Sequence, residues 1–439
     1  MARKMRSSAT VLRAVGVRRV VVAAVAATLA VGVLAQGAPR PGDAADAGAA
    51  TDVQPAARKV GTYTPVNGAI FNRPVGTRWQ QYAVFRHVNR TIDSTPKGAT
   101  IRMAVYSFAH ASTARRLIAA YKRGVKVQAI FNGHESYGPE RRLIRVLGSK
   151  ASKSSFAKFC DRSCRGYKGN MHQKVFLFSQ AGSAQNIVMV GSNNMTRNNA
   201  ENQWSDIYTS VGDPALYWTY AGVFDEMKKD VIQGRQFISA RINNYQTDFY
   251  PNPSVVSPET DPVWNDLNQV SCGVPAPGYG VTVTDPDGTV RQTTAVRISH
   301  HAWNGDRGKW LARKVADLKK AGCDVRIVYG IGIGGAVKAI LENNGIPLKA
   351  NAVPGKRTHQ KVLTVNGTYA GNPASKVVWN GSQNWSDGAL KRDDTTLRVD
   401  DPTAAVVQER EPLLDVLELE TPQPVDPGPH LTSPARATP

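Results

Sequence analysis

Two short stretches of the chain combine residue types suited to attack on a phosphate ester. His172 is followed two positions later by Lys174, and the same His-x-Lys pattern recurs at His359 and Lys361. Side chains i and i+2 of a strand share a face, so each histidine is expected to project beside its lysine. A histidine can attack phosphorus or donate a proton, and a lysine can hold a phosphate oxygen. The two stretches are therefore candidates for phosphodiester chemistry.

A Gly-Ser-x-Asn turn follows each pair about twenty residues later. The two turns contain Gly191, Ser192 and Asn194, and Gly381, Ser382 and Asn384. A carboxamide and a hydroxyl can each donate a hydrogen bond to a phosphate oxygen. Glycine has no Cβ, so the backbone there can approach a ligand closely. We expect the serines and glycines to bind the substrate phosphate and the asparagines to take part in catalysis.

The paired motifs resemble those of the phospholipase D superfamily of phosphodiesterases, over roughly residues 65–410. The resemblance implies an α/β fold of two homologous sheet-and-helix halves, related by a pseudo-twofold axis and sharing one active site. It implies that His172 attacks phosphorus to form a phosphohistidine. His359 would then protonate the leaving alcohol and activate water. The pseudo-symmetry leaves the reverse assignment of the two histidines open.

The sequence departs from the family pattern in both copies. The family has an aspartate five residues after the lysine, whereas this chain has Ser179 and Asn366. Asn366 precedes Gly367 and would suit a tight turn ending the strand, and Ser179 could act similarly. The family aspartate is usually taken to be structural, so the chemistry is expected to survive.

A nucleophilic imidazole needs an acceptor for its second nitrogen. The family has an acid shortly after Gly-Ser-x-Asn, and here Asp206 and Asp394 each stand just before a predicted strand. Glu201 and Asp393 are the alternatives. A carboxylate that merely starts a strand or turn is the other explanation for these positions.

The elements around the motifs occur twice in the same order. Each copy has a strand, a helix ended by glycine, a second strand and then the motif strand. The ranges are 101–108, 112–123, 125–131 and 172–178 in the first copy, and 295–299, 308–321, 323–329 and 359–365 in the second. The strand–helix–strand order predicts parallel strands covered by helices. The motifs repeat after about 187 residues (359 minus 172), which indicates two homologous halves.

The predicted organisation has six parts. They are a signal peptide (1–35), a flexible leader (36–60), the first half (61–232), an irregular connector (233–294) containing a turn at 285–288, the second half (295–415, with a helix after Val406) and a disordered Pro-rich tail (416–439). The signal peptide is predicted from six basic residues followed by an apolar run over 20–35. This predicts a secreted, extracellular protein; a membrane anchor is the alternative.

The chain has 439 residues and a formal charge of +21, which leaves about +15 (21 minus 6) after loss of the signal peptide. A basic protein favours anionic partners. The leading substrate is a phospholipid at a membrane surface, cleaved on the head-group side by water or another alcohol. A secreted nuclease acting on DNA or RNA is the alternative, and a weakly active or inactive binder of anionic lipid or nucleic acid is a third. We expect no cofactor, no metal and a monomer without a stable protein partner.

Four cysteines in an exported chain suggest two disulfides, for which three pairings exist. Cys160 and Cys164 are close in sequence, and Cys272 with Cys323 is the favoured second pair.

Several other residues are weaker candidates for the pocket or its mouth. They are His110, His134, His300, His301, Trp204, Trp303, Trp385, Arg197, Lys356 and Arg357. Loop, core or solvated positions explain them equally well.

Overall fold

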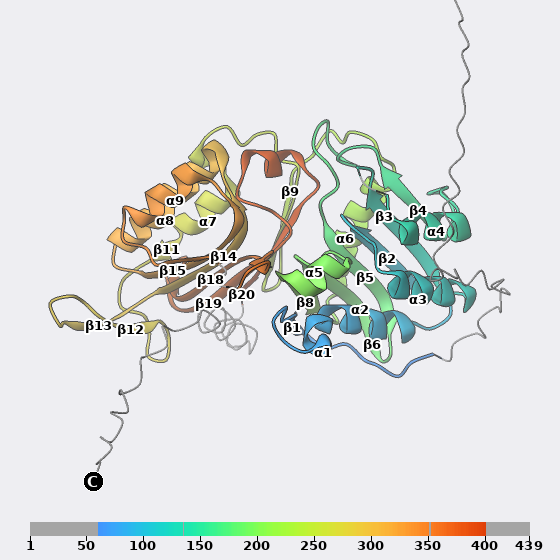
Figure 1. The fold of residues 1–439 in the computed structure, drawn as a ribbon, viewed down its shortest axis with the longest axis horizontal. Helices are drawn as coiled ribbons and strands as arrows, with labels where there is room; N and C mark the ends of the chain where they lie inside the picture. Colours follow the sequence, from blue (N-terminus) through green and yellow to red (C-terminus); the bar gives the residue numbers. More distant parts are fainter. Residues whose placement is uncertain (1–59, 135, 351–352, 401–439) are drawn as a thin grey trace, which may run out of the picture. The chain divides into compact units, whose positions relative to one another are not determined.

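The computed structural model describes residues 60–134, 136–350 and 353–400 (Figure 1). Four predicted segments lie outside these residues. They are the signal peptide, the leader except for residue 60, the helix after Val406 and the Pro-rich tail. No helix within the described ranges is long and apolar enough to cross a membrane.

The first half of the chain forms a seven-stranded sheet in the order β1-β8-β6-β5-β2-β3-β4. The strands are β1 (Gly68–Phe71), β2 (Thr100–Val105), β3 (Lys126–Asn132), β4 (Phe156–Cys160), β5 (Lys174–Ala181), β6 (Ala184–Gly191) and β8 (Asp206–Ser210). Strands β2, β3 and β4 run parallel, connected through α3 (Ala111–Lys122) and α4 (Gly138–Leu147). The predicted parallel strand–helix–strand unit is therefore confirmed.

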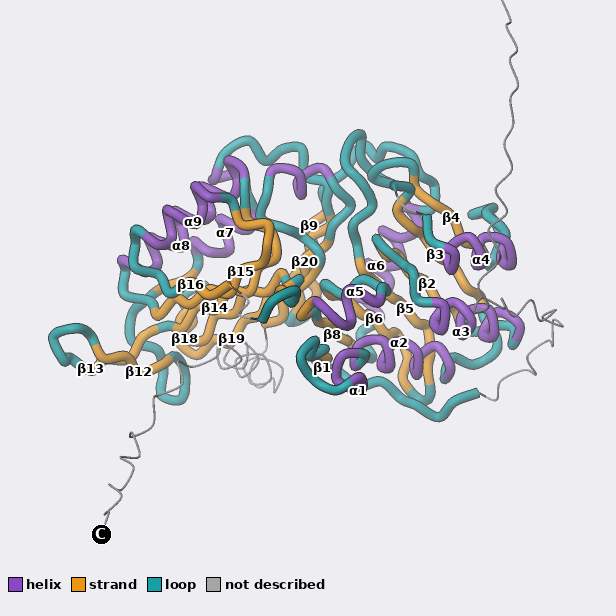
Figure 2. The backbone as a smooth tube through the Cα atoms, viewed as in Figure 1, coloured by secondary structure: helices purple, strands orange, loops and turns teal. Residues whose placement is uncertain are grey.

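The second half repeats this arrangement in a larger sheet, in the order β16-β15-β14-β18-β19-β20-β10-β9 with β11 beside β18. The strands are β9 (Ile238–Ile242), β10 (Tyr245–Phe249), β11 (Val270–Ser271), β14 (Ala295–Trp303), β15 (Asp324–Ile333), β16 (Leu348–Ala350), β18 (Lys361–Tyr369), β19 (Asn372–Gly381) and β20 (Thr395–Asp400). Again β14, β15 and β16 are parallel, and α8 (Gly305–Lys320) and α9 (Gly335–Glu342) connect them. Figure 2 shows the strands in orange and the helices in purple.

The remaining helices are α1 (Arg78–Gln81), α2 (Ala83–Asp93), α5 (Arg197–Asn202), α6 (Pro214–Met227), α7 (Pro262–Asn268), η1 (Pro258–Thr260) and η2 (Asp387–Lys391). The crossover helices α3 and α8 are each followed by a glycine in the left-handed region, Gly124 (φ 93°) and Gly322 (φ 98°). Glycine adopts this conformation without the steric cost of a side chain, so the chain can leave each helix and begin the next strand two residues after the glycine.

Three apolar clusters form most of the core. Helices α2, α3 and α4 pack on one face of the first sheet, and α7, α8 and α9 pack on the second sheet. Between them, α6 packs through residues such as Tyr217 and Phe224 against the other face of the first sheet. The same cluster includes Phe249 of β10 and Leu397 of β20. The two halves therefore share one apolar core through α6.

The predicted irregular connector (233–294) is wrong in part. It contributes β9 and β10 to the second sheet, pairing with β20, and it contains α7. The predicted turn at 285–288 does lie between two paired strands, β12 (Val281–Thr284) and β13 (Val290–Thr293). Strand β4 was also missed, because its polar surroundings mask a short run. The connector is ordered by the pairing of β10 with β20, although its Pro-rich sequence does not indicate strands.

The prediction that Ser179 and Asn366 end their strands in tight turns is wrong. Both lie inside strands, β5 and β18. The hydroxyl of Ser179 accepts a hydrogen bond from the backbone N–H of Thr100 at 2.9 Å. The carboxamide oxygen of Asn366 accepts one from the N–H of Gly280 at 3.1 Å. Each polar acceptor therefore ties its motif strand to a neighbouring segment.

Both favoured cysteine pairs are disulfides in the structure: Cys160 with Cys164, and Cys272 with Cys323. The second bridge joins the segment containing β11 to the start of β15, across 51 residues.

We predict that Gly191→Ala and Gly381→Ala each destabilise the protein by about 2–3 kcal/mol, because a Cβ would meet the carbonyl oxygen of Asp206 or Thr395. Gly381 also has φ 151°, which disfavours a side chain. Gly222→Ala is the matched control, since Gly222 is an exposed residue of α6 with no neighbouring atom in the way. That change should be neutral or stabilising. Urea unfolding of the three variants measures the difference, and equal stabilities would refute the steric explanation.

Candidate active site

Each motif histidine stands just before its strand and is hydrogen-bonded to the opposite half of the chain. The backbone N–H of His172 donates to the carbonyl of Asp393 at 2.9 Å, and that of His359 donates to the carbonyl of Trp204 at 2.8 Å. Next to His359, β17 (Arg357–Thr358) pairs in parallel with β7 (Gln203–Trp204). The strand prediction was thus wrong for the histidines themselves.

His172 is held by a carboxylate from the second half. Its Nδ1 lies 2.7 Å from Oδ1 of Asp394, and the hydroxyl of Ser382 donates to the same oxygen at 2.6 Å. An ionised carboxylate only accepts hydrogen bonds, so Nδ1 carries the proton and Nε2 keeps a lone pair. This is the tautomer that a nucleophilic imidazole requires.

His359 is held differently. Its Nδ1 lies 2.9 Å from the backbone carbonyl of Ser192, which can only accept, so Nδ1 is again the protonated nitrogen. Asp206, the counterpart of Asp394, accepts a hydrogen bond from the hydroxyl of Ser192 at 2.7 Å. The prediction that the two aspartates hold the two histidines therefore matches the contacts of Asp394, whereas Asp206 is linked to His359 through Ser192.

The carboxylates of the alternative acids make no described hydrogen bond to either histidine ring. Glu201 accepts from the hydroxyl of Tyr82 at 2.8 Å, and a carboxylate oxygen of Asp393 accepts from the backbone N–H of Cys164.

The serines and glycines of the turns make contacts inside the protein, and their predicted binding of phosphate stays a prediction. Ser192 and Ser382 are fully buried and donate their hydroxyls to Asp206 and Asp394. Gly191 and Gly381 lie against the backbone of β8 and β20, where any side chain would clash. These four residues hold the acids and the strand ends together.

The two lysines are buried and turn back toward their own histidines. The ammonium group of Lys361 donates to the carbonyl of His359 at 2.6 Å, and that of Lys174 donates to the carbonyl of His172. The lysines therefore place two cations beside the two imidazoles, as the His-x-Lys spacing predicted.

Asn194 and Asn384 are buried, and their carboxamide oxygens make no hydrogen bond to any residue that the structure describes. Buried polar atoms are usually paired. A carboxamide also offers two N–H donors, which suit the oxygens of a phosphate.

Burial and mutual repulsion determine the charges of the site. Burial, and next Lys174, lower the pKa of His172 to about 3, against the opposing effect of Asp394. Burial also lowers the pKa of His359, with repulsion from Lys361, His301, Lys174 and His172. For Asp394, burial favours the neutral acid, but His172, Lys174 and Ser382 outweigh it and hold its pKa below the ordinary value. Both imidazoles are therefore neutral, and Asp394 is ionised, before a ligand binds.

The lysines are affected in the same way. Burial lowers the pKa of Lys361 to about 7 and also lowers that of Lys174, which Lys361 further repels. An anion between the two lysines would relieve this repulsion.

Tyr106 is a site residue that the sequence did not single out, and His301 is one of the weaker pocket candidates that the structure places at the site. The Tyr106 ring lies 4.7 Å from that of His172, and the His301 ring lies 4.6 Å from that of His359. Their backbone N–H groups make equivalent bonds, to Gln173 at 3.0 Å and to Gln360 at 2.9 Å. The two halves thus differ at one equivalent position, with a phenol beside His172 and an imidazole beside His359. The sequence feature that could have identified this position is its place near the end of the first parallel strand of each half, β2 and β14.

Of the other candidate histidines and tryptophans, His300 pairs with Lys361 in the sheet, and the carbonyl of Trp204 accepts from the N–H of His359. His300 is within β14, not a loop, and accepts from the N–H of Trp385 at 2.9 Å. His110 precedes α3 and lies 2.8 Å from the hydroxyl of Thr113, while His134 is exposed. The three tryptophans Trp204, Trp303 and Trp385 are buried in the core.

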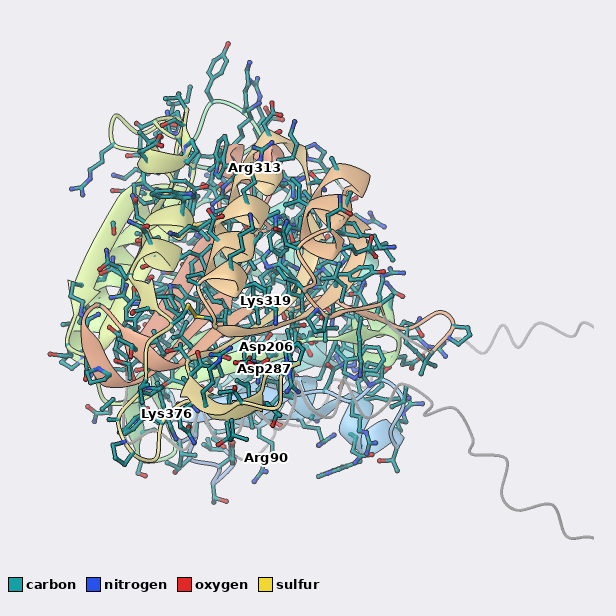
Figure 3. All side chains as sticks on the ribbon, turned by 90° about the vertical axis from the view of Figure 1, so that its left-hand side faces the viewer. Arg90, Asp206, Asp287, Arg313, Lys319 and Lys376 are labelled. Carbon is teal, nitrogen blue, oxygen red and sulfur yellow. A yellow bond between two sulfur atoms is a disulfide. The ribbon has the colours of Figure 1, made fainter. Side chains whose placement is uncertain are left out.

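The basic residues near the motifs join the halves or face solvent. The ammonium of Lys356 donates to the carbonyl of Glu201 at 2.6 Å, and Arg357 belongs to β17. Arg197 is exposed and forms an ion pair with Glu201 at 2.7 Å. Of the charged residues labelled in Figure 3, Arg90, Arg313 and Asp287 are exposed, whereas Asp206 is buried.

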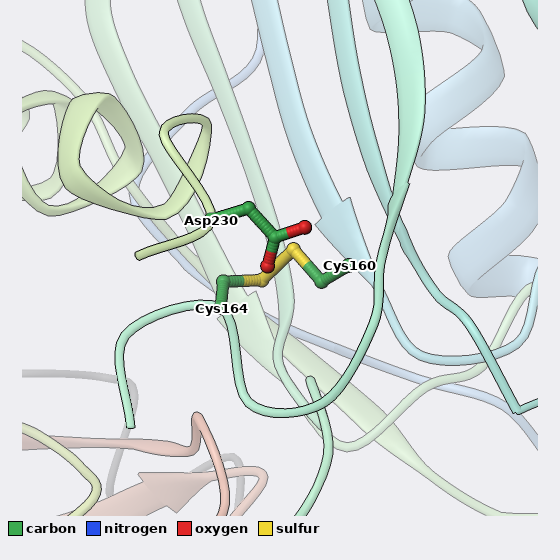
Figure 4. A group of neighbouring side chains, drawn as sticks. All are labelled: Cys160, Cys164 and Asp230. Atoms are coloured by element: carbon green, nitrogen blue, oxygen red, sulfur yellow. A yellow bond between two sulfur atoms is a disulfide. The ribbon is translucent and has the colours of Figure 1, made fainter. Parts of the chain in front are cut away.

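One group within the described residues brings three possible metal ligands together: Cys160, Cys164 and Asp230 (Figure 4). The two sulfurs are bonded to each other, and Asp230 pairs with Lys158 at 3.4 Å. A disulfide has no thiolate to offer a metal, so this group is a structural bridge.

Comparison with known families gives a match over residues 89–228 to a family described as "Cardiolipin synthase, PLD-like domain". The matched range contains His172, and the second half repeats its order of elements. The chain has the phospholipase D fold. The match also supports membership of the phospholipase D superfamily. Comparison with curated protein sequences gives no significant match.

Three solved structures show partial similarity. A polyphosphate kinase from Porphyromonas gingivalis is 14% identical, with 82% of this chain and 51% of the kinase covered and a TM-score of 0.47. The chain thus spans about half the length of that kinase. A phosphatidylserine synthase from Haemophilus influenzae is 12% identical, with coverages of 79% and 86% and a TM-score of 0.49. The phospholipase D family member Nuc from Salmonella typhimurium is 22% identical, with coverages of 29% and 76% and a TM-score of 0.22.

We predict that inorganic phosphate binds more weakly as the pH rises through about 7, because Lys361, with a pKa of about 7, then loses its charge. Affinity should fall by up to about tenfold per pH unit above that value, after allowance for the ionisation of phosphate itself. Isothermal titration calorimetry between pH 6 and pH 9 measures this. A Lys361→Arg variant, whose cation does not titrate in this range, should retain any binding at high pH. Equal pH dependence in the two proteins would contradict the role of Lys361.

Proposed function

We propose that the protein is a metal-independent phosphodiesterase of the phospholipase D type. The observation that carries this proposal is the way the two histidines are held. Each uses Nδ1 to contact the opposite half, His172 through Asp394 and His359 through Ser192, which leaves both Nε2 atoms for chemistry. The two lysines and the two asparagines of the motifs are also buried, and these residue types supply cations and N–H donors for a phosphate.

The contacts support His172 as the nucleophile. Its Nε2 attacks phosphorus while the bond from phosphorus to the leaving alcohol breaks, and the product is a phosphohistidine. Ionised Asp394 stabilises the positive charge that develops on the ring, a contact that His359 does not have.

His359 then has the acid and base role. The bound phosphate is an anion and opposes the repulsion from the lysines, so it favours the protonated imidazole. Nε2 of His359 gives its proton to the leaving oxygen. It next takes a proton from water or another alcohol, whose oxygen attacks phosphorus and releases His172.

Phospholipid is the proposed substrate, cleaved on the head-group side by hydrolysis or by transfer to an alcohol. Tyr167 and Val256, apolar residues on the loops near His172 and Asp394, are 61% and 79% exposed. Exposed apolar residues beside a phosphate site suit a lipid. The net charge of +21 favours the alternative, a nuclease. Export of the protein to the cell exterior is part of the proposal, supported by the predicted signal peptide and by two disulfides.

The proposal is tested with phospholipid vesicles and with plasmid DNA, both in excess EDTA. We expect release of the head-group alcohol from vesicles and an acid-labile phosphoryl group on the protein after rapid quenching, both absent in His172→Asn. Cleavage of DNA without turnover of lipid would establish the nuclease instead. Wild type and His172→Asn that are equally inert on both substrates would refute an enzyme.

We predict that Asp394→Asn lowers kcat by roughly 10²–10⁴-fold, because a carboxamide neither fixes the Nδ1–H tautomer nor stabilises the charged ring. Asp206→Asn is the matched control. Its carboxamide oxygen can still accept the hydroxyl of Ser192, so the loss should stay within about tenfold. Steady-state kinetics with circular dichroism of both variants distinguish the two. A larger loss in Asp206→Asn would reverse the assignment of the two histidines.

A further inference from the structure

A cavity of about 450 Å³ lies at the junction of the two halves. Tyr167 and Lys168 come from the loop before His172, and Leu390 and Lys391 from η2, shortly before Asp394. Its volume is within the range of about 300–1,000 Å³ that is usual for small-molecule pockets.

The cavity walls are continuous with the residues that hold the nucleophile. Lys168 is four residues from His172, and Lys391 is three from Asp394. An extended chain spans at most about 3.6 Å per residue, so both walls lie within roughly 11–15 Å of these groups. The two segments are also joined directly, since the N–H of Asp393 donates to the carbonyl of Asn170 at 3.0 Å and the N–H of His172 donates to that of Asp393 at 2.9 Å.

The lining is largely apolar, with an exposed rim. Val255 and Leu390 are each 8% exposed, whereas Val256 and Tyr167 are 79% and 61% exposed. Trp310 of α8 is half-buried in the wall. An apolar hollow with an apolar rim binds hydrocarbon by removing both surfaces from water.

The charges of the cavity distinguish a lipid from a nucleic acid. Asp306 and Asp387 line it, and the Asp387 carboxylate caps the start of α8 through the N–H groups of Asp306 at 3.1 Å and Arg307 at 2.8 Å. These carboxylates would repel a strand that carries one charge per nucleotide. An uncharged hydrocarbon chain meets no such repulsion. Lys168 and Lys391 are exposed and available to the phosphate region of a lipid.

We propose that this cavity binds an acyl chain of the phospholipid whose phosphate is attacked by His172. The inference rests on the proposed phospholipase activity. It identifies the part of the substrate, besides its phosphate, that the enzyme binds. The diacylglycerol side of the lipid lies in the cavity, and the head group leaves from the opposite side of the phosphorus.

The test is a series of monomeric phosphatidyl substrates with increasing acyl length, compared with a water-soluble phosphodiester that has no acyl chain. For wild type, kcat/KM should rise by up to about fourfold per added methylene until the cavity is filled, and then level off. In Val256→Glu the ratio of long-chain to soluble-substrate kcat/KM should fall at least tenfold. Val274→Glu is the matched control, because Val274 is 75% exposed and does not line the cavity; its ratio should equal that of wild type.

The outcomes separate the inference from the proposed function. Turnover of phospholipid that is independent of chain length, or equal ratios in Val256→Glu and Val274→Glu, would overturn the acyl site while leaving the phospholipase. Turnover of the soluble diester without turnover of any phospholipid would overturn the phospholipase itself. Both valines are exposed, so neither change is expected to prevent folding, and thermal unfolding of each variant checks this.

Acyl chains brominated near the methyl end give a second, direct readout, because bromine quenches tryptophan fluorescence on contact. Binding of such a lipid to the His172→Asn protein should quench Trp310, and the quenched component should be absent after Trp310→Phe. Quenching that persists in Trp310→Phe would place the chain elsewhere.

Discussion

The structure depends on one crossed interaction, in which the residues before each motif strand pair with the opposite half of the chain. The backbone of His172 is bonded to Asp393 and its ring to Asp394, and the backbone of His359 is bonded to Trp204 and its ring to Ser192. Each half therefore completes the other, and neither half alone holds its histidine in a defined tautomer. The shared core around α6 buries the junction and keeps these distances short.

This burial also explains the chemistry of the site. Two lysines and two histidines are buried together, so their charged forms would repel one another, and burial lowers the pKa of each. The electrostatic free energy of these groups in their charged forms is unfavourable without an anion and becomes favourable when an anion binds between them. This is the electrostatic condition for binding a phosphodiester. The ionised Asp394 breaks the symmetry, because it is bonded to only one of the two rings. One fold with two similar halves can thus provide a nucleophile and a proton donor from identical residue types.

Much of the fold was predictable, because the strand–helix–strand pattern and the glycines after α3 and α8 are local signals. The connector was not, because β10 is ordered by pairing with β20, about 150 residues later in the chain. Ser179 and Asn366 illustrate the same limit. Their types suggested turns, but their acceptors bind backbone N–H groups of distant segments, Thr100 and Gly280.

The sequence by itself indicated which residues occupy equivalent positions, because the His-x-Lys and Gly-Ser-x-Asn sets recur in the same order and at similar spacing in two similar halves. Only the tertiary structure decided what each residue does. Ser192 and Ser382 donate their hydroxyls to carboxylates, and the rings of Tyr106 and His301 lie against those of the two histidines. These contacts cross between strands or between halves. Their partners are separated by up to 222 residues, as for His172 and Asp394, and no local pattern records which groups the folded chain brings within bonding distance.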